Sequence, residues 1–212
     1  MPTITALEPQ KRRSSRLNLH LDGQFAFGLS QDLAAEARLE AGQELSPQEV
    51  AALRAQAEFH DALQSALRFL SFRPRSQAEL RQRLRRHYSP PTIEAALERL
   101  EAQGLADDAA FAQFWQENRQ RFRPRGKGLL RAELRHKGVG NETIAEVLEG
   151  VDEEAAARAA SEKRLTSLSG LDTAQFRQRL GGHLRRRGFS WEVIGPTLVW
   201  AWERLTTPQS QG

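Results

Sequence analysis

The chain has 212 residues, of which 39% are hydrophobic and 27% are charged. This length and composition are typical of a globular protein that buries a core, and they exclude a disordered or membrane-embedded polypeptide. Because the sequence contains no cysteine, it excludes disulfides, thiolate metal sites and a cysteine nucleophile.

The formal net charge is only +4, but the isoelectric point is about 10.1, since arginine outnumbers lysine and titrates late. No apolar run approaches the roughly 18 residues of a membrane span, and the first residues lack the apolar core of a secretory signal. We therefore expect a cytoplasmic protein that does not associate with a membrane.

The amino-terminal segment, residues 1–45, is predicted to be a small β-hairpin module. Apolar residues alternate with polar ones in two runs, and Asp22-Gly23 between them suits the positive φ angles of a type I′ turn. Residues 3–7 could supply a third strand, and a short helix should begin near Ser30. Ser46-Pro47 with Glu49 then predicts the capping box of a longer helix.

An internal repeat with a period of 50 residues follows. Leu80 and Leu84 recur as Leu130 and Leu134 and again as Leu180 and Leu184. Arg85, Arg135 and Arg185 keep the same spacing, as do Gly138 with Gly188 and Ile144 with Ile194. A repeat of this length indicates one supersecondary unit used several times.

Each unit is predicted to hold three helices, with boundaries set by proline, glycine and capping residues. Pro74 and Pro124 end first helices, Gly138 and Gly188 end second helices, and Ser89, Asn141 and Ser190 precede third helices. The predicted repeats are 46–106, 107–151 and 152–206, followed by a disordered tail at 207–212. The fold class is therefore mainly α, with three tandem three-helix repeats stacked into an elongated, curved solenoid after the β module.

Positive charge is concentrated in each repeat. Residues 68–86, 119–137 and 177–187 together carry +18, so the rest of the chain carries −14. One edge of the solenoid should be basic and the other acidic. Because arginine pairs bidentately with phosphate or carboxylate, the recurrence favours an interaction surface, although arginines on exposed helix faces also often serve only solvation.

No catalytic, metal or cofactor site is predicted. Gly126-Lys127-Gly128 lacks the spacing of a phosphate-binding loop and follows a helix rather than a strand. The five histidines are not spaced as metal ligands, and no carboxylate pair indicates acid–base chemistry. We expect a protein that is not an enzyme.

The last helix carries aromatic residues at helical spacing. Trp191, Ile194, Leu198 and Trp202 are interpreted as its core stripe. Trp200 falls off that stripe, so it is either an exposed anchor for a partner or a packing residue at the edge of the core.

Four segments resemble, in order, the successive repeats of the RecX family of recombination regulators: ALRFLSFRPRSQAELRQRL, GLADDAAFAQFW, RPRGKGLLRAELRHKGV and FRQRLGGHLRRRGFSWEVI. The resemblance covers about residues 61–205. The opening ITALEPQKRRSSRLNLHLDGQFAFGLSQ is similar to the amino-terminal extension of longer members.

We expect a monomer. The resemblance implies a helical repeat protein without catalytic residues that lies in the groove of the RecA filament and inhibits filament growth, strand exchange and ATP turnover. Its implied partners are RecA, single-stranded DNA and, secondarily, double-stranded DNA. The residues implied to face filament or DNA are Arg73, Arg75, Arg81, Arg85, Arg123, Arg125, Lys127, Arg131, Arg135, Arg185, Arg186 and Arg187.

The first two repeats have the sequence Arg-Pro-Arg, at residues 73–75 and 123–125, at the corner between their first and second helices. The third repeat departs from this pattern, because it lacks Arg-Pro-Arg there and has Gly181-Gly182 inside its second helix. Each glycine destabilises a helix by about 1 kcal/mol relative to alanine, so this second helix is expected to be locally less stable. Two other functions stay open: a DNA-binding protein that acts without a recombinase, and a scaffold that joins other proteins through its two charged edges.

Overall fold

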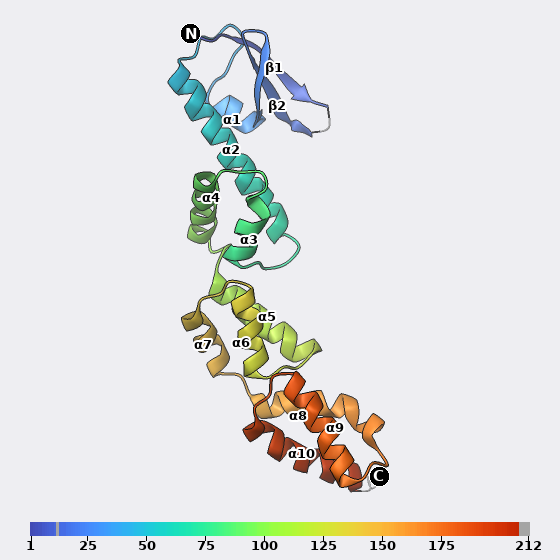
Figure 1. The fold of residues 1–212 in the computed structure, drawn as a ribbon. Coiled ribbons are helices and arrows are strands. Elements are labelled where there is room, and N and C mark those ends of the chain that lie inside the picture. Colours follow the sequence, from blue (N-terminus) through green and yellow to red (C-terminus); the bar gives the residue numbers. More distant parts are fainter. Residues whose placement is uncertain (12, 208–212) are drawn as a thin grey trace. The chain divides into compact units, whose positions relative to one another are not determined.

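A computed structural model describes residues 1–11 and 13–207, and the side chains of all of these except 13 and 14. The predicted tail beyond residue 207 lies outside the described residues. Two compact units are present: one holds Met1–Arg75 with Glu79–Ala106, and the other holds Ser76–Ala78 with the chain from Asp107 onward. Mainly helical structure follows a small sheet, as predicted (Figure 1).

The amino-terminal sheet has the order β1-β2-β3 and is antiparallel throughout, with β1 at Ile4–Gln10, β2 at Arg13–Leu21 and β3 at Gln24–Ser30. Asp22 and Gly23 have φ angles of 49° and 80°, which confirms the predicted turn. Leu19 and Leu29 are fully buried. One face of the sheet therefore contributes to a hydrophobic core.

Two helices complete this module. The hydroxyl of Ser30 caps α1, Gln31–Glu36. The predicted capping box of Ser46 and Glu49 starts α2, Pro47–Leu70. Residues Leu53 and Ala57 of α2 pack in the core of the sheet, whereas Ala66 packs in the next core along the chain. The same helix thus serves as the last element of the module and as the first helix of a repeat.

The predicted three-helix repeats are present. The first uses α2 with α3, Gln77–Leu84, and α4, Pro90–Ala102. The second contains α5, Asp108–Phe122, α6, Lys127–His136, and α7, Asn141–Glu149. The third contains α8, Glu153–Leu165, a 3-10 turn, Thr166–Leu168, α9, Thr173–Arg186, and α10, Trp191–Thr206. All six periodic leucines have no exposed surface, because they form the inner face of each second helix.

Two details differ from the sequence expectations. Trp191 is 63% exposed rather than part of the core. It is the first residue of α10, and helical side chains lean toward the amino-terminal end, so its ring lies beyond the edge of the packed stripe. Residue Gly140, and not Asn141, is the N-cap of α7. Trp200 is half-buried against the third core, which favours its packing role.

Repeats two and three join through a close backbone contact. The amide of Gly126 donates to the carbonyl of Arg187 at 2.9 Å. A Cβ on Gly126 would lie 2.3 Å from the carbonyl oxygen of Gly188, whose own φ is +82°. Glu153 accepts a hydrogen bond from the amide of Lys127 at 2.7 Å. The glycines that superficially suggest a phosphate loop are therefore required for packing.

Residues 76–78 make an equivalent contact within their own unit. The hydroxyl of Ser76 donates to the carbonyl of Lys137 at 2.6 Å, and the carboxylate of Asp108 accepts from the amide of Gln77 at 2.9 Å. A Cβ on Gly138 would lie 2.3 Å from that of Ala78. The start of one second helix thus lies against the glycine that ends the next one, with an acidic residue satisfying its exposed amide.

We predict that Gly126→Ala lowers the free energy of unfolding by about 1–3 kcal/mol, because the added methyl group would overlap backbone atoms that cannot move aside easily. Gly140→Ala is the matched control, since Gly140 is also an N-cap and the nearest atom to its Cβ is 4.0 Å away. Urea denaturation measures both, and equal losses would contradict the steric explanation.

We predict that Gly181→Ala raises the free energy of unfolding by about 0.5–1 kcal/mol, because alanine has the higher helix propensity. Its Cβ would meet side chains of Leu198 and Ile194 at 3.7 and 3.9 Å, which is ordinary packing distance. Thermal unfolding of the variant checks this, and a lower melting temperature would show that the glycine is needed for packing.

Candidate functional site

Two corners with the sequence Arg-Pro-Arg connect the first and second helices of repeats one and two. Residues 73–75 join α2 to α3, and residues 123–125 join α5 to α6. Proline pushes the residue before it out of the helical region, and Arg123 accordingly has φ −145° and ψ 74°. The corners therefore place two arginines each at a sharp turn of the chain.

The arginines of the first corner are held by neighbouring side chains. Arg73 forms a two-pronged ion pair with Glu79, with N–O distances of 3.0 and 3.1 Å. The guanidinium of Arg75 lies 3.9 Å from the centre of the Phe69 ring. Burial, and then the charge of Arg73, lowers the pKa of Arg75. Both side chains help to fix the shape of the corner.

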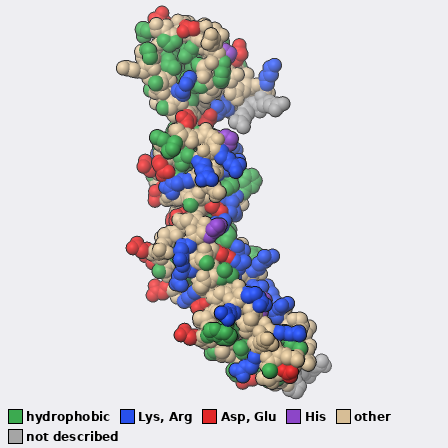
Figure 2. All heavy atoms as spheres, viewed as in Figure 1, with side chains coloured by type: hydrophobic (Ala, Val, Ile, Leu, Met, Phe, Trp, Pro, Cys, Tyr) green, Lys and Arg blue, Asp and Glu red, His purple; other side chains and the backbone are tan. Residues whose placement is uncertain are grey.

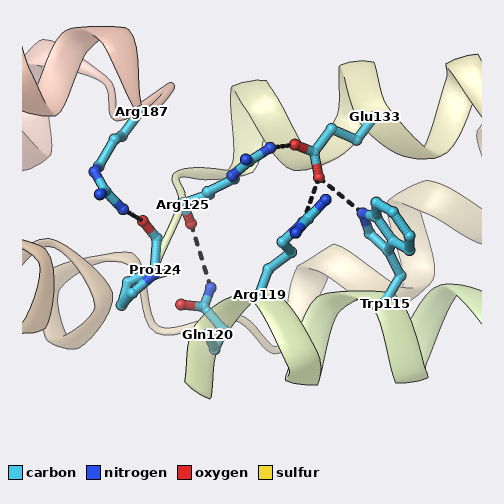
Figure 3. A network of polar contacts seen from close by, with 7 residues as sticks. All are labelled: Trp115, Arg119, Gln120, Pro124, Arg125, Glu133 and Arg187. Atoms are coloured by element: carbon cyan, nitrogen blue, oxygen red, sulfur yellow. Dashed lines mark hydrogen bonds and ion pairs between the residues drawn. The ribbon is translucent and has the colours of Figure 1, made fainter. Parts of the chain in front are cut away.

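A network around Glu133 holds the second corner (Figure 3). The carboxylate of Glu133 accepts hydrogen bonds from the indole nitrogen of Trp115 at 2.8 Å and from Arg119 at 3.0 Å. Its other oxygen pairs with Arg125. The backbone carbonyl of Arg125 accepts from Gln120 at 3.3 Å. This carboxylate ties α5, the corner and α6 together.

Positive charge is nevertheless in excess around this corner. Burial is the main cause that lowers the pKa of Arg125, and Arg119, Arg187 and Arg123 lower it further. The pKa of Arg187 is lowered by its burial and then by Arg123 and Arg164. In the view of Figure 2, basic side chains gather where repeats two and three meet. This region should attract anions.

Three more of the predicted residues make contacts within the protein. Arg81 pairs with Glu94 at 2.9 Å on the surface of the first repeat. The ammonium group of Lys127 donates to the carbonyl of Glu149 at 3.3 Å. Arg187 donates to the carbonyl of Pro124 at 3.0 Å, across the joint between repeats two and three. Lys127 and Arg187 are therefore part of that joint.

The other six predicted residues are exposed, and their side chains form no ion pair or hydrogen bond within the described part of the chain. Three of them lie at the same position of the repeat, at the end of a second helix, where the helix dipole favours positive charge. All six residues are called the free arginines: Arg85, Arg123, Arg131, Arg135, Arg185 and Arg186.

Two exposed aromatic residues were missed by the sequence analysis. Phe72 is 81% exposed and Phe122 is 59% exposed, and each directly precedes an Arg-Pro-Arg corner. Their spacing of 50 residues equals the repeat period, which is the signal that could have identified them. Large apolar side chains exposed at equivalent positions are typical of binding anchors.

Groups of histidine and acidic residues suited to holding a metal ion do not occur in the described ranges. Among the helices of these same residues, none has both the length and the apolar character to cross a bilayer. The candidate site is thus a cationic surface with exposed aromatic residues at its corners.

Four family models match successive parts of the chain in order. The "Regulatory protein RecX N-terminal domain" matches residues 2–46, and the first, second and third three-helix domains of RecX match residues 62–100, 107–148 and 152–196. The chain is 32% identical to Regulatory protein RecX of Bacillus subtilis (strain 168) over 202 residues, which is 93% of this chain and 76% of the relative.

Other relatives agree with this match. Regulatory protein RecX of Prosthecochloris aestuarii is 39% identical over 138 residues, 65% of this chain and 91% of the relative. A crystal structure of regulatory protein RecX has a TM-score of 0.70 and 26% identity, and the match covers 92% of this chain and 98% of that one. With its repeats, its amino-terminal sheet and these matches, the chain belongs to the RecX family of regulatory proteins.

Proposed function

We propose that this chain regulates the RecA recombinase by binding along the groove of the RecA–DNA filament in the cytoplasm. Binding there suppresses filament extension, ATP hydrolysis and strand exchange in DNA repair and recombination, without catalysis by the chain itself. The observation that carries this proposal is the recurrence of Arg85, Arg135 and Arg185 at one position in each repeat, exposed and without an acidic partner in the described residues.

A filament presents the same surface at regular intervals, so a chain with repeated cationic groups can contact several subunits at once. Exposed single ion pairs contribute only about 0–1 kcal/mol each. Several such contacts on one chain act together, because the first raises the effective concentration of the next. Repetition therefore explains how weak contacts could give useful affinity.

Most of the twelve predicted residues divide into two groups with different parts in this proposal. The free arginines supply the contacts with filament or DNA. The second group mainly holds the corners and the joint in shape. In the first corner Arg73 pairs with Glu79 and Arg75 lies against Phe69. In the second corner Arg125 pairs with Glu133, and at the joint Arg187 donates to the carbonyl of Pro124. Arg81 and Lys127 also have partners within the chain, the exposed Glu94 and the backbone carbonyl of Glu149, and they belong to neither group.

We predict that Arg85→Glu with Arg135→Glu raises the concentration needed for half-inhibition of RecA ATPase at least about tenfold, since each reversal replaces attraction with repulsion. RecA, single-stranded DNA and ATP are mixed with the full chain, and ATP hydrolysis and filament length are followed. Circular dichroism should show an unchanged fold.

The matched control is Arg99→Glu with Arg177→Glu, which makes the same change in net charge on other exposed helix positions. It should inhibit like the parent chain. Equal inhibition by both double variants would show that the repeated position does not bind the filament. Absence of any inhibition by the parent chain would reject the proposed function.

If the two groups of arginines have these different roles, single substitutions within repeat two should affect either the stability of the fold or the inhibition of RecA. Arg125→Gln should lower the free energy of unfolding by about 1–3 kcal/mol, because it removes a charged partner of Glu133. Arg131→Gln should change it by less than about 0.5 kcal/mol, since that side chain is exposed, yet should weaken inhibition. Urea denaturation and the ATPase assay separate the two, and identical behaviour would reject this division.

The alternative function is that of a DNA-binding protein without sequence preference that needs no recombinase, and the excess of arginine around the second corner favours it. Titration of bare DNA over a range of salt concentrations distinguishes it. Direct binding to duplex DNA would weaken with a slope of about −0.9 per phosphate neutralised. Tight binding with such a slope, together with no effect on RecA, would favour this alternative.

A further inference from the structure

The third repeat contains a cationic cavity that the periodic arginines do not explain. It has a volume of about 560 Å³ and lies among the end of α8, the 3-10 turn and α9. Arg164, Arg179 and Arg186 line it, together with the polar residues Ser167, Gln178 and His183. No carboxylate occurs among the described residues of the lining, so its charge is not balanced locally.

Burial and neighbouring arginines both act on His183 in this cavity. The pKa of His183 is lowered to about 4, first by burial and then by the charges of Arg187, Arg164 and Arg186. Its Nε2 atom is buried and has no hydrogen-bond partner in the described part of the chain. The imidazole is therefore neutral at pH 7, because a further positive charge at this position is strongly disfavoured.

In a second cavity, on another part of α8, carboxylates balance the positive charge of an arginine. That cavity, of about 350 Å³, is lined by Arg158 together with Asp152, Glu154 and Glu162. Arg158 pairs with Glu154 there at 3.5 Å. The same helix therefore pairs Arg158 with an acidic neighbour, whereas Arg164 lines a cavity with two other arginines and without a carboxylate among the lining residues that the structure describes.

We propose that the His183 cavity is a binding site for a phosphate group, in which Arg164, Arg179 and Arg186 supply the charged hydrogen-bond donors. Guanidinium groups match the geometry of phosphate oxygens and bind them through paired hydrogen bonds. The phosphate can come from the backbone of a nucleic acid or from a free anion. One of its arginines, Arg186, is also a free arginine, but the site uses none of Arg85, Arg131 or Arg135, the residues changed in the tests of the proposed function.

This site also accounts for the departure of the third repeat from the pattern of the first two. The third repeat has no Arg-Pro-Arg corner, and its chain instead passes through the 3-10 turn and Gly170, with φ +79°. Arg164 precedes that turn, and Arg179 and Arg186 follow it on one helix. The repeat thus forms a concave cationic site where the other two form a corner.

The test follows the ring resonances of His183 by NMR in the full chain while inorganic phosphate is added at constant ionic strength, with chloride as the balancing anion. Bound phosphate favours the charged imidazolium, so the pKa of His183 should rise from about 4. In Arg164→Gln with Arg186→Gln, the apparent affinity for phosphate should fall at least about tenfold.

The matched control is Lys163→Gln with Arg177→Gln, which removes the same charge from the same two helices but from residues outside the cavity. Its phosphate affinity should stay within about twofold of the parent. A response to a single-stranded oligonucleotide at much lower concentration than to phosphate would identify nucleic acid as the source, and the reverse order would identify a free anion.

Three outcomes would overturn the proposal. The first is a His183 response that chloride alone reproduces, which would indicate screening only. The second is an equal loss of affinity in both double variants, and the third is a stronger response to a glutamate-rich peptide than to either phosphate ligand. None of these bears on inhibition of RecA by the parent chain, so the two proposals fail or survive separately.

Discussion

The backbone contact between Gly126 and the segment Arg187-Gly188 is the constraint on which the second unit depends. It requires two glycines, because a Cβ at either position would overlap its neighbour. It also brings the basic ends of two repeats together: the pKa of Arg125 is lowered by burial and further by Arg187 and Arg123, and the pKa of Arg187 is lowered by burial and further by Arg123. The concentration of charge at this joint is thus a consequence of how repeats two and three pack.

The arginines at this joint repel one another, so acidic side chains are needed to stabilise it. Glu133 does this in repeat two by accepting from Trp115 and Arg119 and by pairing with Arg125. Glu153 compensates the exposed amide at the start of α6, as Asp108 does at the start of α3. Acidic residues are therefore used for shape at buried places, while the arginines at the outer ends of the second helices are left unpaired. This separation gives one chain both a stable corner and a surface with available charge.

The repeated helices could be predicted from the sequence because their causes are local. Buried leucines such as Leu80 and Leu130 recur at helical spacing, and the side chains of Ser46 and Asp172 accept hydrogen bonds from helix amides as their residue types indicate. The pairing of Arg125 with Glu133 could not be predicted, because it depends on the approach of two helices. The role of Gly126 was also hidden, since a glycine next to lysine indicates a phosphate loop as readily as a steric joint.

The third repeat shows that the same fold can present positive charge in more than one way. In repeats one and two an exposed phenylalanine precedes a proline corner, where Arg73 pairs with Glu79 and Arg125 pairs with Glu133. In repeat three the corner is replaced by a turn beside a cavity, where His183 stays neutral among arginines. An exposed phenylalanine beside a corner suits contact with a broad surface, whereas a cationic cavity suits a single small anion. The three repeats are therefore equivalent in their cores and different in what their surfaces can bind.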